Sequence, residues 1–103
     1  MSRTPAVRVG TDLYWSGSEA AFRAAAEQVR EALPATEEGL RAEVEAAASF
    51  GWLAPVDLPE PERSTLLRAL GRAGTAPQEP SVAGELDLLR RMAEQALRET
   101  EAS

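Results

Sequence analysis

The sequence contains no histidine and no cysteine, and these two absences exclude most of the familiar catalytic and metal-binding chemistry. Without cysteine there are no disulfides, no thiolate metal sites and no thiol nucleophile. Without histidine the chain lacks the usual general base and the commonest metal ligand. Acid–base chemistry would have to use Asp or Glu, and a bound metal would have to be a hard ion held by oxygens. We therefore expect no catalytic residues, no metal site and no cofactor.

Long apolar runs and glycine-rich loops are also missing. No apolar stretch approaches the ~20 residues that a membrane-spanning helix needs. Residues 1–10 lack the continuous apolar run of a signal peptide. The seven glycines are scattered singly rather than gathered in a phosphate-binding loop. These features predict a soluble, cytoplasmic protein that does not bind membranes.

Positive charge is scarce: 11 arginines, with no lysine, stand against 17 acidic residues, which gives a net charge of −6. Nucleic-acid binding requires clustered cations, whereas these arginines are interleaved with glutamates. We therefore expect no nucleic-acid partner. An acidic domain suits a basic protein partner, because complementary electrostatic fields raise association rates. The other interpretation of the charge is that it serves solubility alone.

What the sequence does contain is abundant alanine, leucine, glutamate and arginine, arranged with helical periodicity. Its 103 residues suit a single domain with one modest core. We predict an α+β fold that is predominantly α, a four-helix bundle-like domain with a small N-terminal β-hairpin. The hairpin is expected at about residues 6–16, and the helices at about 18–33, 37–50, 61–73 and 82–100.

The hairpin is predicted from two short runs of β-forming residues around Gly10, which suits the first position of a two-residue type II′ loop. That register places Val7 opposite Tyr14. Ser16 and Glu19 then have capping-box spacing at the start of the first helix. Because a lone hairpin is marginal in water, it must pack on the helices or pair with a strand of another chain.

Glycine, serine and proline predict the ends of the other elements. Gly51 suits the left-handed residue that ends a helix. The segment 52–61 contains three prolines and is expected as an extended loop, and 75–80 is expected as a mobile connector. In the last helix, Ser81 suits the N-cap after Pro80. The wide apolar stripe of that helix predicts contacts with several elements at once.

Five aromatic side chains are the candidates for a hydrophobic binding surface. Trp15, Phe22 and Phe50 are expected in the core. Tyr14 and Trp52 flank elements that cannot stand alone. Each of these two is either an exposed binding residue, since tyrosine and tryptophan are enriched at binding hot spots, or the side chain that attaches its element to the bundle.

The second candidate site is a run of carboxylates on the second helix, at Glu37, Glu38 and Glu45. These residues either meet a basic partner or form an ordinary solvated face, with Glu37 and Arg41 paired at four-residue spacing. No calcium-binding loop motif and no histidine accompany them, so metal binding is not predicted.

The missing catalytic residue types and the acidic charge favour a non-enzymatic protein-binding module that docks on, or inhibits, a basic protein. Immunity proteins, antitoxins and small adaptors offer a comparison by size and charge. The predicted partner-binding residues are Tyr14, Trp52, Glu37, Glu38 and Glu45. The alternative is a homodimer formed through the hairpin edge or through a coiled-coil-like stripe on the C-terminal helix. The residues of this stripe are Leu86, Leu89, Ala93, Ala96 and Thr100. A third hypothesis is an enzyme that uses only carboxylates and arginines.

Overall fold

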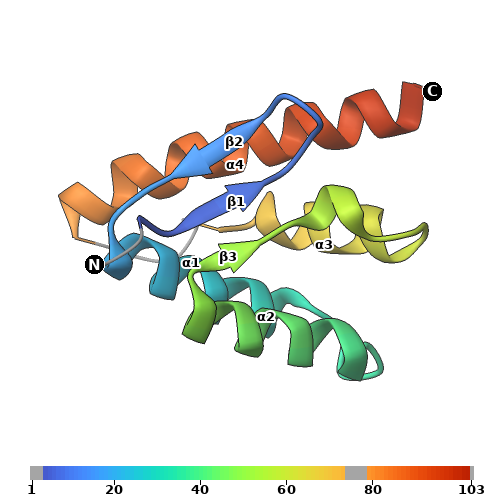
Figure 1. Cartoon of the computed structure of the whole chain (residues 1–103), viewed down its shortest axis with the longest axis horizontal. Coiled ribbons are helices and arrows are strands. Elements are labelled where there is room, and N and C mark those ends of the chain that lie inside the picture. Colours follow the sequence, from blue (N-terminus) through green and yellow to red (C-terminus); the bar gives the residue numbers. More distant parts are fainter. Residues whose placement is uncertain (1–3, 74–78, 103) are drawn as a thin grey trace.

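The structure, a computed structural model, describes residues 4–73 and 79–102. Most of these residues are helical, and three short strands form a small sheet (Figure 1). The prediction of a predominantly helical chain with strands near its N-terminus is confirmed. The strands are β1 (Ala6–Arg8), β2 (Tyr14–Ser16) and β3 (Trp52–Leu53). The helices are α1 (Glu19–Ala32), α2 (Glu38–Phe50), the 3-10 turn η1 (Pro55–Asp57), α3 (Glu62–Leu70) and α4 (Pro80–Ala102).

The sheet has the strand order β2-β1-β3, with β1 antiparallel to β2 and parallel to β3. Val7 on β1 pairs with Trp15 on β2 and with Leu53 on β3, and all three side chains are buried. Because side chains alternate along a strand, Arg8 and Tyr14 lie on the opposite face. In Figure 1, β2 crosses in front of α4. One face of the sheet therefore packs against helices, and the other faces solvent.

The predicted hairpin register is wrong by one residue. A turn from Gly10 to Leu13 replaces the expected two-residue loop, and the Leu13 N–H donates to the Gly10 carbonyl at 3.3 Å. This turn places Trp15, rather than Tyr14, opposite Val7. The physical reason is burial: Trp15 is only 1% exposed, and a slip by one residue would move this large side chain to the solvent face.

The segment 52–61, expected as an extended loop, begins with a strand. Gly51 ends α2 in the left-handed conformation that the sequence predicts, with φ of 74°. The chain then brings Trp52 and Leu53 beside β1, where the Ala6 N–H donates to the Gly51 carbonyl at 3.0 Å. Strand β1 is therefore paired on both sides within the chain. A strand of two residues is too short to show any hydrophobic periodicity, so the sequence gives no signal for it.

The helices do not pack as a regular four-helix bundle, so that part of the prediction is not confirmed. Helix α1 contacts both α3 and α4, which also pack on each other, whereas α2 packs mainly on α1 and touches β3. In Figure 1, α1 and α3 lie between α2 and α4. The apolar stripe of α4 packs inside the chain through side chains that are at most 3% exposed: Leu86, Leu89, Ala93 and Ala96.

The start of α4 differs from the prediction. The helix begins at Pro80 rather than at residue 82, so Ser81 lies inside the helix and is not its N-cap. Proline is favoured at the first helical position because its missing N–H would have no partner there. The first turn is closed by the Ala83 N–H, which donates to the Glu79 carbonyl at 2.8 Å. Most of the predicted connector 75–80 lies outside the residues that the structure describes.

Candidate functional site

A hydrogen-bond network holds the sheet on α4. The Trp15 Nε1–H donates to the backbone carbonyl of Glu85 at 2.8 Å. The Glu85 carboxylate accepts the backbone N–H and the Oγ–H of Ser18, each at 2.8 Å. The Ser18 Oγ in turn accepts the N–H of Ala21 at 3.1 Å and so caps α1. Ser16, predicted as this cap, belongs to β2 instead.

Gly17 makes this close approach possible. A Cβ atom added to Gly17 would lie 2.6 Å from Cζ2 of Trp15 and 3.2 Å from Oε1 of Glu85. Real Cβ atoms do not approach other atoms as closely as the first of these distances. The strand, the glycine and the cap therefore fix the orientation of β2 against α4, and this orientation turns Tyr14 away from the helices.

The open side of the sheet carries two exposed aromatic side chains from strands far apart in the sequence. Tyr14 on β2 is 54% exposed and Trp52 on β3 is 46% exposed. Their ring centroids are 6.4 Å apart, with the ring planes tilted by 44°. The Arg8 guanidinium lies 5.7 Å from the Tyr14 centroid, a cation–π contact, and its Nη1 is 3.8 Å from the Asp57 carboxylate. We call Arg8, Tyr14 and Trp52 the aromatic face.

The structure brings together only part of the predicted site. Tyr14 and Trp52 are in contact, but the predicted carboxylates lie elsewhere. Glu37 and Glu38 are at the N-terminal end of α2, and Trp52 follows its C-terminal end, about 20 Å away along a helix of 13 residues. Glu45 forms an ion pair with Arg30 of α1, with Nη1 to Oε1 at 3.0 Å.

Two exposed or half-buried residues, Phe50 and Arg8, were not among the predicted site residues. Phe50, predicted to be in the core, is 79% exposed at the end of α2, two residues before Trp52. Arg8 alternates with the buried Val7 and Val9 along the chain, and this alternation is the signal that places it on the solvent side. The other core predictions among the aromatics are confirmed, since Trp15 and Phe22 are both buried.

A shallow groove of about 640 Å³ lies between α1 and α2. It includes the Arg30–Glu45 ion pair, and it also contains Arg23 and Glu27. Its cations and carboxylates are equal in number, so the groove does not select a ligand by charge. The described residues contain no group of three or more acidic side chains placed to bind a metal ion.

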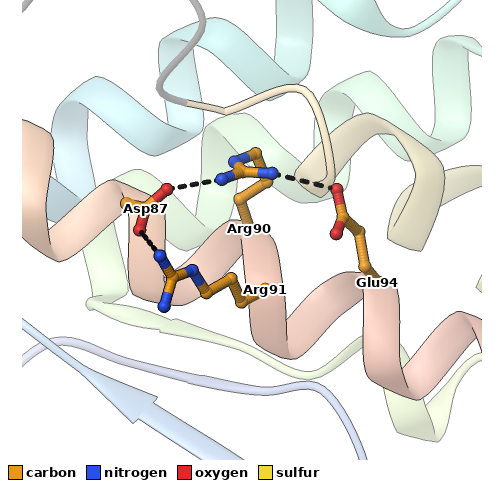
Figure 2. Close-up of polar contacts among 4 residues, drawn as sticks. All are labelled: Asp87, Arg90, Arg91 and Glu94. Carbon is orange, nitrogen blue, oxygen red and sulfur yellow. Dashed lines mark hydrogen bonds and ion pairs between the residues drawn. The ribbon is translucent and has the colours of Figure 1, made fainter.

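Helix α4 carries a second charged cluster, shown in Figure 2. Asp87 accepts hydrogen bonds from Arg90 and contacts Arg91 at 3.0 Å, and Arg90 also reaches Glu94 at 3.2 Å. The hydrogen bond from Arg90 lowers the pKa of the Asp87 carboxyl, and the same contact raises the pKa of Arg90. Because these arginines are neutralised by their helix neighbours, the cluster does not form a cationic binding patch.

Comparison of the chain with models of known protein families, with curated proteins and with solved structures gives no match. None of the helices in the described residues combines the length and the apolar character that crossing a membrane requires. The aromatic face and the charge of the chain are therefore the features that bear on function.

Proposed function

We propose that this chain is a non-enzymatic protein-binding domain that docks on a basic protein through the aromatic face. The observation that carries the proposal is the contact between Tyr14 and Trp52, two large side chains about half exposed on the side of the sheet away from the helices. Tyrosine, tryptophan and arginine are the residues most enriched at binding hot spots. Burial of the two exposed rings by a partner would supply the main part of the binding energy.

The basic character of the partner is inferred from the net charge of −6. Glu37, Glu38 and Glu45 lie away from the aromatic face, so we assign them to long-range attraction rather than to direct contact. Glu45 retains its ion pair with Arg30 in this proposal. An inhibitor or adaptor, comparable in size and charge to an immunity protein or antitoxin, fits these properties. The expected cytoplasmic location stays a prediction.

Self-association is the second candidate function. Strand β2 is at the edge of the sheet, which favours pairing with another strand. The stripe of α4 is less available, because its apolar residues are already buried within the chain. Two copies would also bring together two chains of charge −6, which opposes association at low salt. We therefore rank the homodimer below binding to a basic partner.

The experiment is a comparison of tagged wild type with the double variant Tyr14→Ala, Trp52→Ala in pull-downs from a lysate of the source organism. We expect wild type to capture a basic protein at low salt and less of it at roughly 0.5 M salt, where the Debye length is only a few Å. The double variant is expected to lose this capture. Leu88→Ala, which removes an exposed side chain of α4, is the matched control and should retain it.

Equal capture of the same protein by wild type and by the double variant would overturn the proposal. Sedimentation of the purified chain over a wide range of concentrations tests the second candidate separately. A mass that stays that of one chain rules out the homodimer, and a mass that doubles with concentration favours it over the basic partner.

A further inference from the structure

Strand β2 has a free edge whose backbone groups point away from β1. The residues that flank β2, Leu13 and Gly17, form backbone hydrogen bonds with the segment that contains β1. The Val9 N–H donates to the Leu13 carbonyl at 3.0 Å, and the Gly17 N–H donates to the Pro5 carbonyl at 3.3 Å. In an antiparallel pair, bonded and non-bonded residues alternate. The backbone groups of Tyr14 and Ser16 therefore face outward, and among the described strands none lies beyond β2.

Two exposed carboxylates bracket this edge along the chain. Asp12 lies in the turn before β2, and Glu19 is the first residue of α1 after it. Neither of them forms an ion pair with any residue that the structure describes. The side chain of Tyr14, between them, is exposed on the open face. The edge thus combines backbone donors and acceptors that have no partner among the described residues, an aromatic ring and negative charge at both ends.

We propose that the edge of β2 accepts an extended, basic segment of the partner protein as a fourth strand of the sheet. The segment's backbone bonds to Tyr14 and Ser16, one of its side chains packs beside the Tyr14 ring, and its arginines or lysines meet Asp12 and Glu19. This inference rests on the proposed function, because it specifies the partner of the same surface. Only about five extended residues are needed to pair with a strand of three residues.

Charge decides between this occupant and a second copy of the chain. In an antiparallel pairing of two β2 strands, Asp12 of one copy would lie toward Glu19 of the other, so like charges would meet at both ends of the interface. A basic segment replaces these repulsions with attractions. The shortness of β2 also limits self-pairing, since few backbone bonds are available to offset the repulsion.

The test is a titration of the ¹⁵N-labelled chain of 103 residues with a short peptide that alternates arginine and valine, followed by amide chemical shifts. We expect the amides of Tyr14 and Ser16 to shift and to saturate. Two control peptides separate the contribution of backbone hydrogen bonds from the contribution of charge. One keeps the sequence but is N-methylated throughout its backbone, and the other carries glutamate in place of arginine. Each control should bind at least about tenfold more weakly.

Two double charge-reversal variants test whether the peptide's arginines lie near Asp12 and Glu19. Asp12→Arg with Glu19→Arg should weaken the arginine peptide at least about tenfold. Glu31→Arg with Glu43→Arg makes the same change in net charge at exposed positions of α1 and α2 and should weaken it much less. An otherwise unchanged amide spectrum of each variant shows that it is folded.

The outcomes distinguish this inference from the proposed function. Equal binding of the N-methylated peptide, or no peptide-induced shift at Tyr14 and Ser16, overturns strand addition. The aromatic face then still stands, provided that Tyr14→Ala with Trp52→Ala loses the partner. If the two amides instead shift with concentration of the chain alone, together with a doubled mass, the edge pairs with a second copy and the inference is overturned.

Discussion

The carboxylate of Glu85 on α4 completes the N-terminal cap of α1 at Ser18, from 67 residues away in the sequence. In a capping box, a glutamate three positions into the helix returns to the N–H of the N-cap residue. Here that position is Ala21, which has no carboxylate, and Glu85 accepts the Ser18 N–H in its place. A local capping motif is thus completed by a tertiary contact, which couples α1, α4 and, through Trp15, the sheet.

This coupling leads to a first prediction. Ser18→Ala and Glu85→Ala should each lower the free energy of unfolding by about 1 kcal/mol. The double variant should lose less than the sum of the two, with an interaction of about 0.5–1 kcal/mol, because both changes remove the hydrogen bond from Ser18 Oγ to Glu85. Urea unfolding followed by circular dichroism measures these differences. Strict additivity would mean that the Ser18–Glu85 contact is not formed in solution.

The second prediction concerns Gly17. Because a Cβ at this position would overlap the Trp15 ring, Gly17→Ala should destabilise the chain by about 1–3 kcal/mol. Gly39→Ala is the matched control: it lies in α2 with no atom within 4 Å of its would-be Cβ, and it should be stabilising by about 0.5–1 kcal/mol. Thermal unfolding of the two variants should therefore shift in opposite directions. Shifts of the same sign would contradict the close packing at Trp15.

The third prediction is a loss of stability in acid. The hydrogen bond from Ser64 Oγ to Glu60 lowers the pKa of that carboxyl below its ordinary 4.5, and the hydrogen bond from Arg90 lowers the pKa of Asp87 below 3.8. A lowered pKa in the folded state means that the unfolded chain binds protons more readily. Both carboxylates therefore add stability above these ordinary values and lose it as the pH falls through their folded pKa values.

Urea midpoints measured between neutral pH and the onset of acid unfolding check this prediction. Stability should decline as the pH falls below about 4.5. Glu60→Gln and Asp87→Asn should each make the decline shallower, since each removes one of the titrating groups. If both variants follow the wild-type curve in parallel, the two carboxylates do not contribute to the acid response.

The fourth prediction compares two phenylalanines. Phe22 is 4% exposed in α1 and Phe50 is 79% exposed at the end of α2. Phe22→Ala should cost about 3–5 kcal/mol, because it leaves a cavity in the core. Phe50→Ala should change stability by less than about 0.5 kcal/mol, as for other surface substitutions. Chemical denaturation measures both. A large cost at Phe50 would place it in the core, as predicted for an aromatic side chain.

Local sequence signals predicted the helices better than they predicted the sheet. The i, i+3 and i, i+4 spacing on α1 identifies its buried face, and Gly51 ends α2 as its conformational freedom predicts. Residue type cannot show which parts of a helix are covered, and so it places Phe50 in the core, where aromatic side chains usually lie. Burial at a helix end depends on what packs there, which is a property of the whole fold.

The sheet and the site depend on contacts between distant segments. Tyr14 and Trp52 could be predicted individually from residue type, but their contact arises from the parallel pairing of β3 with β1. That pairing leaves no periodic pattern in a strand of two residues. The register of β2 follows from the burial of Trp15 against α4, and Glu85 resembles any other helical glutamate in the sequence. These relationships exist only once the chain is folded.

The bond between Trp15 and Glu85 also sets an order of events during synthesis. Strands β1 and β2 leave the ribosome early, but the carbonyl that receives the Trp15 N–H is 70 residues further along the chain. Until α4 has been made, the Trp15 indole lacks this hydrogen-bond partner. Because α4 follows the hairpin in the chain, the hairpin can be anchored on this helix only after α4 has been synthesised.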